Sequence, residues 1–339
     1  MLRFNSTMHK ILILGGTNFI GRVLTEALTS NPNIQITLFN RGITNAGIFP
    51  TVERVVGDRN VNNDVQQISK TKWDYVIDLS CYYPHQLEAV MRHVNKDLKR
   101  HLFISTCSVY CSDQKLVLRD EKADTWPCSE EDKTDHSSLT YGPRKAECER
   151  ILQKSSFSHS ILRPALVYGP FDNTDRLYYW LYQVRNTSQL LVPGMGTNQF
   201  SITFVKDLVQ AIVQCLCDTR NSEILNIISH QQSSITEIIE LSAELFEKEP
   251  YQHYADTLYL INNQVNQWLD IPLWLDNNYF TFDSSKMISE LGIVPTDFER
   301  SLQETIAYYD NLHWKSPACG ISEERKLQLI KGLSEGLGY

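Results

Sequence analysis

The chain has 339 residues, of which 42% are hydrophobic and 21% are charged. This balance is typical of a folded protein and excludes a largely disordered chain. A single hydrophobic core seldom grows past roughly 250–300 residues, so we expect two domains, or one large domain with a smaller one attached. The net charge is −8, so the chain has no excess of basic residues of the kind that nucleic-acid-binding proteins carry. No apolar run reaches the roughly 18 residues that cross a bilayer.

The N-terminal residues lack the long apolar core of a signal peptide. The eight cysteines lie mostly within apolar or helical segments, and none stands at the spacing of a zinc site. We therefore expect a cytoplasmic protein with reduced thiols and no bound metal.

The first half of the chain alternates strand-like and helix-like segments. The apolar runs predict strands at residues 10–14, 34–39, 52–56, 75–79, 101–105 and 160–163, and the amphipathic stretches predict helices at 19–29, 62–69, 84–95 and 139–154. Continuous apolar strands separated by helices indicate an α/β fold with a parallel sheet covered on both faces.

The pattern changes after about residue 170. Helices are predicted at 176–185, 205–217, 235–247 and 301–311, separated by short strands and by loops rich in Gly, Pro and Asn. Residues 250–282 are more irregular. This change indicates a second structural unit.

A glycine-rich loop lies between the first predicted strand and the first predicted helix. A dinucleotide pyrophosphate needs a tight turn there, close approach of the backbone, and free N–H groups at a helix N-terminus. Asn18 stands where a middle glycine is usual, and Asn tolerates left-handed backbone angles. The candidate cofactor-binding residues of this loop are Gly15, Thr17, Asn18, Phe19, Ile20 and Gly21. A glycine-rich turn without a ligand is the alternative.

The end of the second predicted strand bears on the choice of cofactor. An acidic residue there would accept hydrogen bonds from the ribose of NAD, whereas a basic residue favours the 2′-phosphate of NADP. Asn40 is neutral and Arg41 is positive, which favours NADP over NAD unless Arg41 only faces water. Asp58, after the third predicted strand, is a candidate acceptor for the adenine amino group.

Three residues form a candidate catalytic set. Tyr141 and Lys145 are four residues apart in a predicted helix and therefore share one face. A phenol is a poor base at neutral pH, and an adjacent ammonium helps the phenolate to form. Such a pair can move a proton on a substrate oxygen while hydride passes to or from a nicotinamide. Thr106, at the end of the fifth predicted strand, can hydrogen-bond the same oxygen.

The order of these motifs over residues 9–312 resembles that of the extended short-chain dehydrogenases/reductases, the NAD-dependent epimerase/dehydratase family. Besides the glycine loop and the Tyr141–Lys145 spacing, the resemblance rests on ISTCSVY at residues 104–110 and RPALVYGP at 163–170. Within the family, ILILGGTNFIG, TLFNRG and GPFDNTDRLYYW are most similar to a bacterial 2′-hydroxyisoflavone reductase-like branch.

The resemblance implies a Rossmann-type doubly wound parallel sheet with a smaller mixed α/β C-terminal substrate domain. It also implies that Thr106, Tyr141 and Lys145 are the catalytic triad. The residues implied beside the nicotinamide are Leu79, Ser80 and Cys81 at its ribose, and Pro164 and Val167 at its amide.

Two departures from the family pattern restrict the reaction. Dehydratases of the family carry an Asp-Glu pair after the catalytic Thr, where this sequence has Cys107 and Ser108. Epimerases that act on nucleotide sugars tend to carry a phosphate-clamping Arg near the position of Phe200 and Ser201. These differences argue against dehydration and against a nucleotide-sugar substrate.

The substrate pocket is expected between the two units, where ligands commonly bind. The candidates are Arg176, which can hold an anionic group, together with Tyr179 and Trp180, which can form an apolar wall. The alternative is an amphipathic helix whose aromatic residues belong to the core and whose Arg is solvated.

We divide the chain into a dinucleotide-binding domain over residues 8–170, a substrate domain mainly over 171–312, and a tail over 313–339 with one helix. Residues 189–217 are expected to return to the first domain. A homodimer is a further expectation from the resemblance.

The predicted function is that of an NAD(P)-dependent oxidoreductase, which transfers hydride between nicotinamide and a carbonyl or alcohol carbon of a small molecule. One alternative is a sugar or nucleotide-sugar epimerase that keeps NAD tightly bound. Another is a non-catalytic, nucleotide-sensing or RNA-associated relative, against which the acidic charge and the catalytic set both argue.

Overall fold

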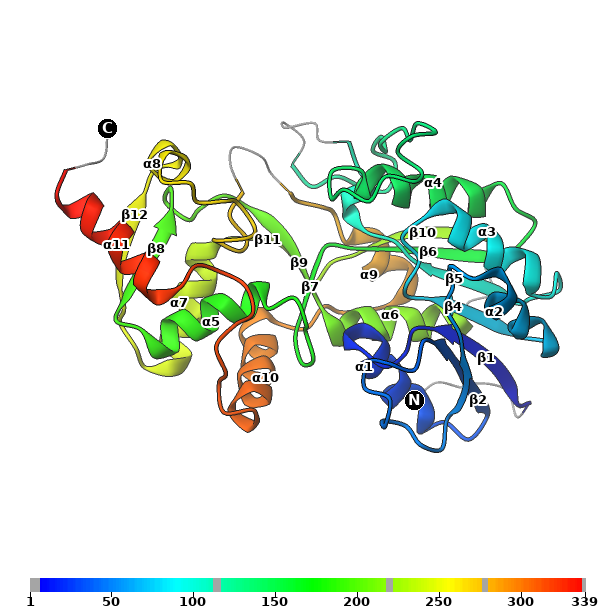
Figure 1. Ribbon diagram of the computed structural model, residues 1–339. Helices are drawn as coiled ribbons and strands as arrows, with labels where there is room; N and C mark the ends of the chain where they lie inside the picture. Colours follow the sequence, from blue (N-terminus) through cyan, green and yellow to red (C-terminus); the bar gives the residue numbers. More distant parts are fainter. Residues whose placement is uncertain (1–6, 112–116, 218–221, 276–279, 337–339) are drawn as a thin grey trace.

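A computed structural model describes residues 7–111, 117–217, 222–275 and 280–336. These residues form two lobes (Figure 1). The first lobe contains a seven-stranded sheet in the order β10-β6-β5-β4-β1-β2-β3, and every pairing in it is parallel. Its strands are β1 (His9–Leu14), β2 (Ile34–Asn40), β3 (Glu53–Val56), β4 (Tyr75–Asp78), β5 (Arg100–Ile104), β6 (His159–Pro164) and β10 (Ser222–Ile227). The predicted α/β fold with a doubly wound parallel sheet is confirmed.

Helices cover both faces of this sheet. Ile11 and Ile13 of β1 pack into one buried cluster, whereas Leu12 and Leu14 pack into another, because successive side chains of a strand point to opposite faces. The helices of the first face are α1 (Phe19–Thr29), α6 (Val205–Cys217) and α9 (Ser285–Leu291), and those of the second are α2 (Asn62–Gln66), α3 (Pro84–His93) and α4 (Tyr141–Gln153). The predicted helix over 62–69 consists of α2 and a short 3-10 turn, η1 (Gln67–Lys70). A second turn, η2 (Cys107–Val109), follows β5.

The second lobe is built around a large apolar cluster in which Trp180 is fully buried. Its helices are α5 (Arg176–Asn186), α7 (Ile235–Phe246), α8 (Thr257–Asn262), α10 (Phe298–Asn311) and α11 (Glu323–Ser334). It also contains a parallel pair of strands, β8 (Gln189–Pro193) and β12 (Tyr251–Ala255). A three-stranded sheet of β7 (Leu166–Tyr168), β9 (Phe200–Phe204) and β11 (His230–Ser233) lies where the lobes meet (Figure 1).

Residues 189–217 were expected to return to the first domain, but only their helix packs there. Their helix α6 does pack on α1 and on the seven-stranded sheet. Their strands do not return, because β8 pairs with β12 and β9 pairs with β7 and β11. In their place the first lobe takes β10 and α9 from later in the chain. The expected tail helix is α11, and residues 337–339 of the tail lie outside the described residues.

Within the described residues, no helix is both long and apolar enough to cross a membrane. The same part of the chain holds no group of three His, Cys, Asp or Glu residues arranged to bind a metal.

A buried ion pair supports the sheet behind the predicted catalytic Thr. Arg163 on β6 donates from Nε to Oε1 of Glu149 on α4 at 3.0 Å, and the same oxygen accepts a hydrogen bond from Ser105 Oγ at 2.5 Å. Arg163 also donates to Tyr110 Oη at 2.9 Å. These contacts join α4 to the ends of β5 and β6, next to Thr106.

A second buried ion pair joins the loop after β3 to the carboxyl end of β4. Arg59, in the loop after β3, donates to both carboxylate oxygens of Asp78 at 2.8 and 2.9 Å. Asp78 ends β4 and is fully buried. Burial alone would raise the pKa of the Asp78 carboxyl, but the Arg59 guanidinium outweighs that effect and holds the pKa below its ordinary value.

We predict that Asp78→Asn destabilises the protein by about 3–5 kcal/mol at pH 7, because it leaves the Arg59 cation buried without a counter-charge. Since the folded carboxyl has a lower pKa than the unfolded one, the pair stabilises the fold fully above about pH 4, and this stabilisation is lost as pH falls further. Urea unfolding at pH 7 and at pH 3 measures both effects.

The control is Glu130→Gln, which breaks an exposed ion pair with Lys133 and should change stability by less than about 1 kcal/mol. An Asp78→Asn effect that is equally large at both pH values would contradict this role of the ion pair.

Candidate functional site

The glycine loop forms a close backbone turn between β1 and α1. Gly15 and Gly16 have φ angles of +115° and +93°, which L side chains rarely adopt. A Cβ on Gly21 would lie 2.6 Å from the backbone nitrogen of Gly16, so a side chain there would force the turn apart. Thr25 Oγ1 donates to the carbonyls of Gly16 and Gly21 at 3.0 and 2.8 Å.

Asn18 does not use the left-handed conformation that its side chain would tolerate. Its φ of −131° and ψ of 145° are extended, and it acts as the N-cap residue of α1. The positive φ of 35° falls on Phe19 instead. Asn18 therefore fits at the position of the usual middle glycine because the backbone there is extended, a conformation that any residue adopts.

A cavity of about 500 Å³ begins at this loop and runs along the carboxyl ends of β1, β2 and β4. Most of the predicted cofactor residues line it: Gly15, Thr17, Asn18, Phe19, Ile20, Gly21, Asn40, Arg41, Asp58, Leu79 and Ser80. Three predicted residues are not among the lining residues. Cys81 is buried toward α4, Pro164 ends β6, and Val167 lies in β7.

The strand-end residues Asn40, Arg41 and Asp58 all line the cavity, and the cofactor contacts expected of them stay predictions. The Asn40 amide donates to the Gly15 carbonyl at 3.0 Å and accepts from the Gly42 N–H at 2.9 Å, so this side chain fixes the glycine turn. Arg41 is exposed at the cavity. The Asp58 carboxylate accepts two hydrogen bonds from Asn60, at 2.8 and 2.9 Å.

Sequence reasoning missed several lining residues, among them Arg59, Asn60, Tyr82, Gln86 and Asn173. Arg59 also donates to the Ser80 hydroxyl at 3.0 Å, which joins the Asp78 ion pair to the cavity wall. The sequence places Arg59 directly after Asp58, but nothing in that string indicates a partner 19 residues later.

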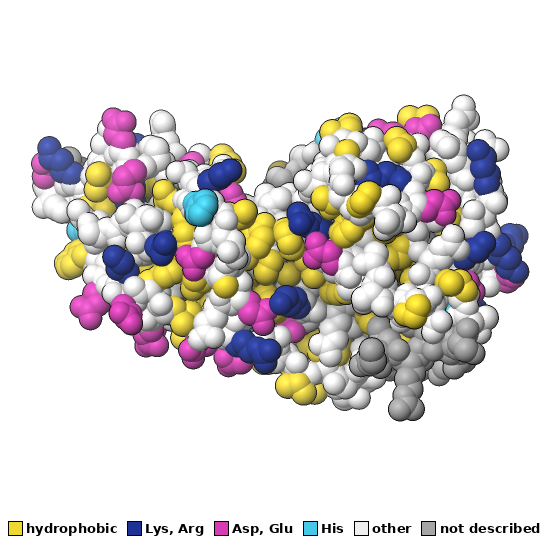
Figure 2. Space-filling view, turned by 90° about the horizontal axis from the view of Figure 1, so that it is seen from below, with side chains coloured by type: hydrophobic (Ala, Val, Ile, Leu, Met, Phe, Trp, Pro, Cys, Tyr) yellow, Lys and Arg dark blue, Asp and Glu magenta, His cyan; other side chains and the backbone are white. Residues whose placement is uncertain are grey.

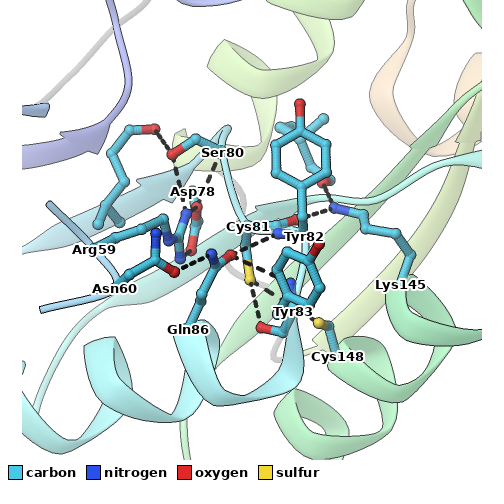
Figure 3. Close-up of polar contacts among 12 residues, drawn as sticks. Arg59, Asn60, Asp78, Ser80, Cys81, Tyr82, Tyr83, Gln86, Lys145 and Cys148 are labelled. Carbon is cyan, nitrogen blue, oxygen red and sulfur yellow. Dashed lines mark hydrogen bonds and ion pairs between the residues drawn. The ribbon is translucent and has the colours of Figure 1, made fainter. Parts of the chain in front are cut away.

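A chain of hydrogen bonds crosses from the Asp58 loop to Tyr82 (Figure 3). Gln86 on α3 donates to Asn60 Oδ1 at 2.8 Å and accepts from the Tyr82 backbone N–H at 2.9 Å. The Tyr82 ring is half exposed, and its centroid lies 6.2 Å from that of Tyr141. Tyr82 thus lies between the cavity and the predicted catalytic tyrosine.

Tyr141 and Thr106 come together at the ends of α4 and β5. Tyr141 is the first residue of α4, and Thr106 caps the η2 turn by accepting a hydrogen bond from the Ser108 N–H at 3.1 Å. Desolvation in the cleft raises the pKa of the Tyr141 phenol, while a hydrogen bond with Thr106 and the nearby Arg176 and Arg144 cations act in the opposite direction.

Lys145 lies on the same helix but is anchored elsewhere. Its Nζ donates to the carbonyl oxygens of Cys81 at 2.9 Å and Ile104 at 2.6 Å, and it lies 4.1 Å from the centroid of the Phe103 ring. The groups that lower the Tyr141 pKa are Thr106, Arg176 and Arg144. The largest effects that oppose desolvation therefore come from these groups, and the effect expected of Lys145 on this phenol stays a prediction.

The predicted substrate residues separate into two groups. Arg176 begins α5, with Nε donating to Thr174 Oγ1 at 3.2 Å, and its charge acts on Tyr141. Tyr179 and Trp180 are buried in the core of the second lobe, and the Trp180 indole donates to the Pro272 carbonyl at 2.8 Å. Neither residue lines the cavity at the glycine loop, whereas Tyr179 lines a second cavity, of about 650 Å³, beside α11. Figure 2 shows the surface hollowed between the two lobes, with hydrophobic side chains in the hollow and both basic and acidic side chains around it.

Known proteins share this fold. UDP-glucuronic acid 4-epimerase from Bacillus cereus in complex with NAD aligns with a TM-score of 0.69 at 21% identity, covering 90% of this chain and 100% of that one. UDP-glucose 4-epimerase from Thermotoga maritima with UDP-glucose gives 0.71 at 18% identity, covering 90% and 99%. dTDP-glucose 4,6-dehydratase from Bacillus anthracis in complex with NAD gives 0.70 at 20% identity, covering 91% and 99%. At these identities the likeness is one of fold.

Sequence comparison adds a relative and a family. The chloroplast stem-loop binding protein of 41 kDa b from Arabidopsis thaliana is 28% identical over 237 residues, covering 66% of this chain. The chain spans 59% of that relative's length. The model of the NAD dependent epimerase/dehydratase family matches residues 11–227, which is more than half of the chain. The chain therefore belongs to the NAD dependent epimerase/dehydratase family.

Proposed function

We propose that this protein binds NAD(P) in the cavity at the glycine loop and catalyses hydride transfer to or from a carbonyl or alcohol carbon of a small molecule. The observation that carries the proposal is the position of Tyr141 and Thr106. Tyr141 lies beside Tyr82, with their ring centroids 6.2 Å apart, and is hydrogen-bonded with Thr106. Tyr82 lines the cavity that begins at the glycine turn, whereas Tyr141 and Thr106 lie behind it and are not among the lining residues. The first lobe would then be the cofactor domain and the second the substrate domain.

The residues of the cavity fit a dinucleotide. The Gly15–Gly21 turn leaves backbone uncovered at the N-terminus of α1, where a pyrophosphate is stabilised by free N–H groups. Arg41 and Asp58 lie on the adenosine side, and Leu79 and Ser80 lie toward the catalytic residues. When bound there, a nicotinamide would supply the site that accepts or donates hydride.

The chain's own residues would handle the proton. The Tyr141 phenol exchanges a proton with the substrate oxygen, and Thr106 hydrogen-bonds that oxygen and fixes its position. The Arg176 and Arg144 cations favour the phenolate, which partly offsets desolvation. Arg176 can also hold an anionic group of the substrate.

The substrate is proposed to be a small carbonyl or alcohol compound rather than a nucleotide sugar. Phe200 and Ser201 are buried within β9, where a phosphate-binding Arg would be expected in a nucleotide-sugar epimerase. The sequence strings shared with the 2′-hydroxyisoflavone reductase-like branch agree with a reductase. An epimerase that recycles its hydride on tightly bound NAD is the other reaction compatible with the same residues.

RNA binding is a second candidate, and its support is the name of the chloroplast relative. The relative is matched over only part of its length, and the net charge of −8 gives no general attraction to phosphate backbones. The oxidoreductase proposal explains the catalytic set, whereas RNA binding does not.

For the cofactor we propose a preference for NADP over NAD. Arg41 is exposed at the cavity, whereas Asn40 is engaged with Gly15 and Gly42, so a cation rather than an acceptor faces the expected ribose position. Two of the similar solved structures, those from Bacillus cereus and Bacillus anthracis, are complexes with NAD, which makes this preference a direct subject for experiment.

Tyr141→Phe is predicted to lower turnover by about 10²–10⁴-fold, because it removes the proton donor but keeps the ring. The measurement is oxidation of NADPH or NADH with a panel of aldehydes, ketones and sugars, together with cofactor binding followed by fluorescence. Cofactor affinity should be unchanged. Tyr82→Phe, which alters the adjacent tyrosine, is the matched control, and equal turnover in Tyr141→Phe and the wild type would refute the mechanism.

Arg41→Ala is predicted to weaken NADPH binding by about tenfold or more while leaving NADH binding unchanged, since only NADPH presents a 2′-phosphate to the guanidinium. Arg300→Ala, which removes an exposed arginine of α10 in the other lobe, serves as the control. An unchanged ratio of the two dissociation constants in Arg41→Ala would show that Arg41 only faces water.

A further inference from the structure

Two thiols lie in contact behind the loop that follows β4. Cys81 Sγ and Cys148 Sγ are 4.0 Å apart, although the residues are 67 positions apart in the sequence. Both side chains are buried and both thiols are free. Figure 3 shows Cys81 on the loop and Cys148 on α4, with their contact drawn between them.

The thiol pair adjoins the candidate site on both of its elements. The residues on either side of Cys81, Ser80 and Tyr82, line the cavity. The Cys81 carbonyl accepts the hydrogen bond from Lys145 Nζ, and Cys148 lies three residues after Lys145 on the helix that begins with Tyr141. A covalent bond between the sulfurs would therefore join the cavity wall to the catalytic helix.

The two sulfurs are chemically unequal. Burial raises the pKa of the Cys81 thiol, but the hydrogen bond with Cys148 and the Arg59 and Lys145 cations outweigh it, so the net pKa of Cys81 is lowered. Cys148, hydrogen-bonded to Cys81 and buried, has its pKa raised. The Arg59 and Lys145 cations favour the Cys81 thiolate, which is the reactive form of a thiol. Cys81 also lies between two residues that line the cavity, Ser80 and Tyr82, so we assign it as the sulfur that is oxidised first.

We propose that Cys81 and Cys148 are an oxidisable pair, which hydrogen peroxide converts to a disulfide that weakens cofactor binding. The inference rests on the proposed function, because the regulated site is the proposed cofactor cavity. A peroxide is close to water in size, and Cys81, although buried, lies between two residues that line the cavity, Ser80 and Tyr82. Larger oxidants do not fit a fully buried thiol pair.

The oxidation balances with peroxide alone. The Cys81 sulfur attacks one peroxide oxygen, the O–O bond breaks, and the products are a Cys81 sulfenic acid and one water. The Cys148 sulfur then attacks the sulfenic sulfur, the S–O bond breaks, and the released hydroxide takes the Cys148 proton to form a second water. Two thiols are oxidised to one disulfide, and one peroxide is reduced to two waters.

The disulfide has a structural consequence. Its sulfurs are about 2.05 Å apart, so the present separation must close by about 2 Å. Cys148 is held within α4, whereas Cys81 lies in an irregular segment between β4 and α3, so the movement falls on Cys81. That movement displaces the carbonyl that anchors Lys145 and the neighbouring Ser80 and Tyr82 of the cavity wall.

The test treats the full-length protein with hydrogen peroxide, blocks the remaining thiols, and identifies linked peptides by mass spectrometry. We expect a peptide pair joined through Cys81 and Cys148, and an NADPH affinity about tenfold lower, as for one lost charge-assisted hydrogen bond. A dithiol reductant should restore the affinity. The proposal is overturned if other cysteines oxidise while this pair stays reduced, or if the linked protein binds NADPH as before.

Cys148→Ser cannot form the disulfide, so it distinguishes the effect of the disulfide on cofactor binding from the effects of peroxide on other residues. Cys148→Ala is used instead if the serine variant does not fold. Either variant should keep its NADPH affinity after peroxide, whereas Cys319→Ser, which alters a partly exposed cysteine of the second lobe, should respond like the wild type. A Cys148 variant that loses affinity to the same extent would contradict the proposal. Failure of the reduced wild type to bind NADPH would instead count against the proposed function.

Discussion

The Arg59–Asp78 ion pair is the constraint on which the shape of the site depends. In the sheet order, β1 and β2 lie between β3 and β4, so Arg59 reaches from the loop after β3 across the ends of two strands to Asp78. Arg59 therefore forms part of the cavity wall at the carboxyl ends of the sheet, and the buried Asp78 fixes its position. Its hydrogen bond to Ser80 extends the same support to the segment that leads to Cys81 and Tyr82.

The catalytic end depends on a corresponding set of backbone contacts. Lys145 holds the Cys81 and Ile104 carbonyls together, so one side chain of α4 fixes the segments that follow β4 and β5. Gln86 fixes the backbone of Tyr82 from α3. The segments around Tyr141 thus follow separate strands but are held in place by buried hydrogen bonds. Groups that are fixed in this way before the substrate binds are preorganised for proton transfer.

Much of this arrangement could be predicted because its signals are local. The Gly15–Gly21 turn lies between consecutive elements, and the Tyr141–Lys145 spacing follows from helix geometry alone. The same reasoning failed where partners are distant in sequence. No local pattern pairs Arg59 with Asp78 or β8 with β12, and the aromatic residues Tyr179 and Trp180 suit a core as well as a pocket. The position of Lys145 on its helix follows from the local pattern, but its buried carbonyl partners depend on how the ends of β4 and β5 meet α4.

The central claim is that the glycine turn and its cavity bind a nicotinamide dinucleotide, and a titration with NADPH and NADH tests it most directly. The informative comparison is Gly21→Ala, whose methyl group would collide with the Gly16 backbone, against Gly47→Ala, whose methyl group would meet nothing within 4 Å. The account predicts that Gly21→Ala, folded as judged by circular dichroism, loses cofactor binding while Gly47→Ala binds like the wild type. Equal binding by the two variants, or no binding by the wild type, would contradict it.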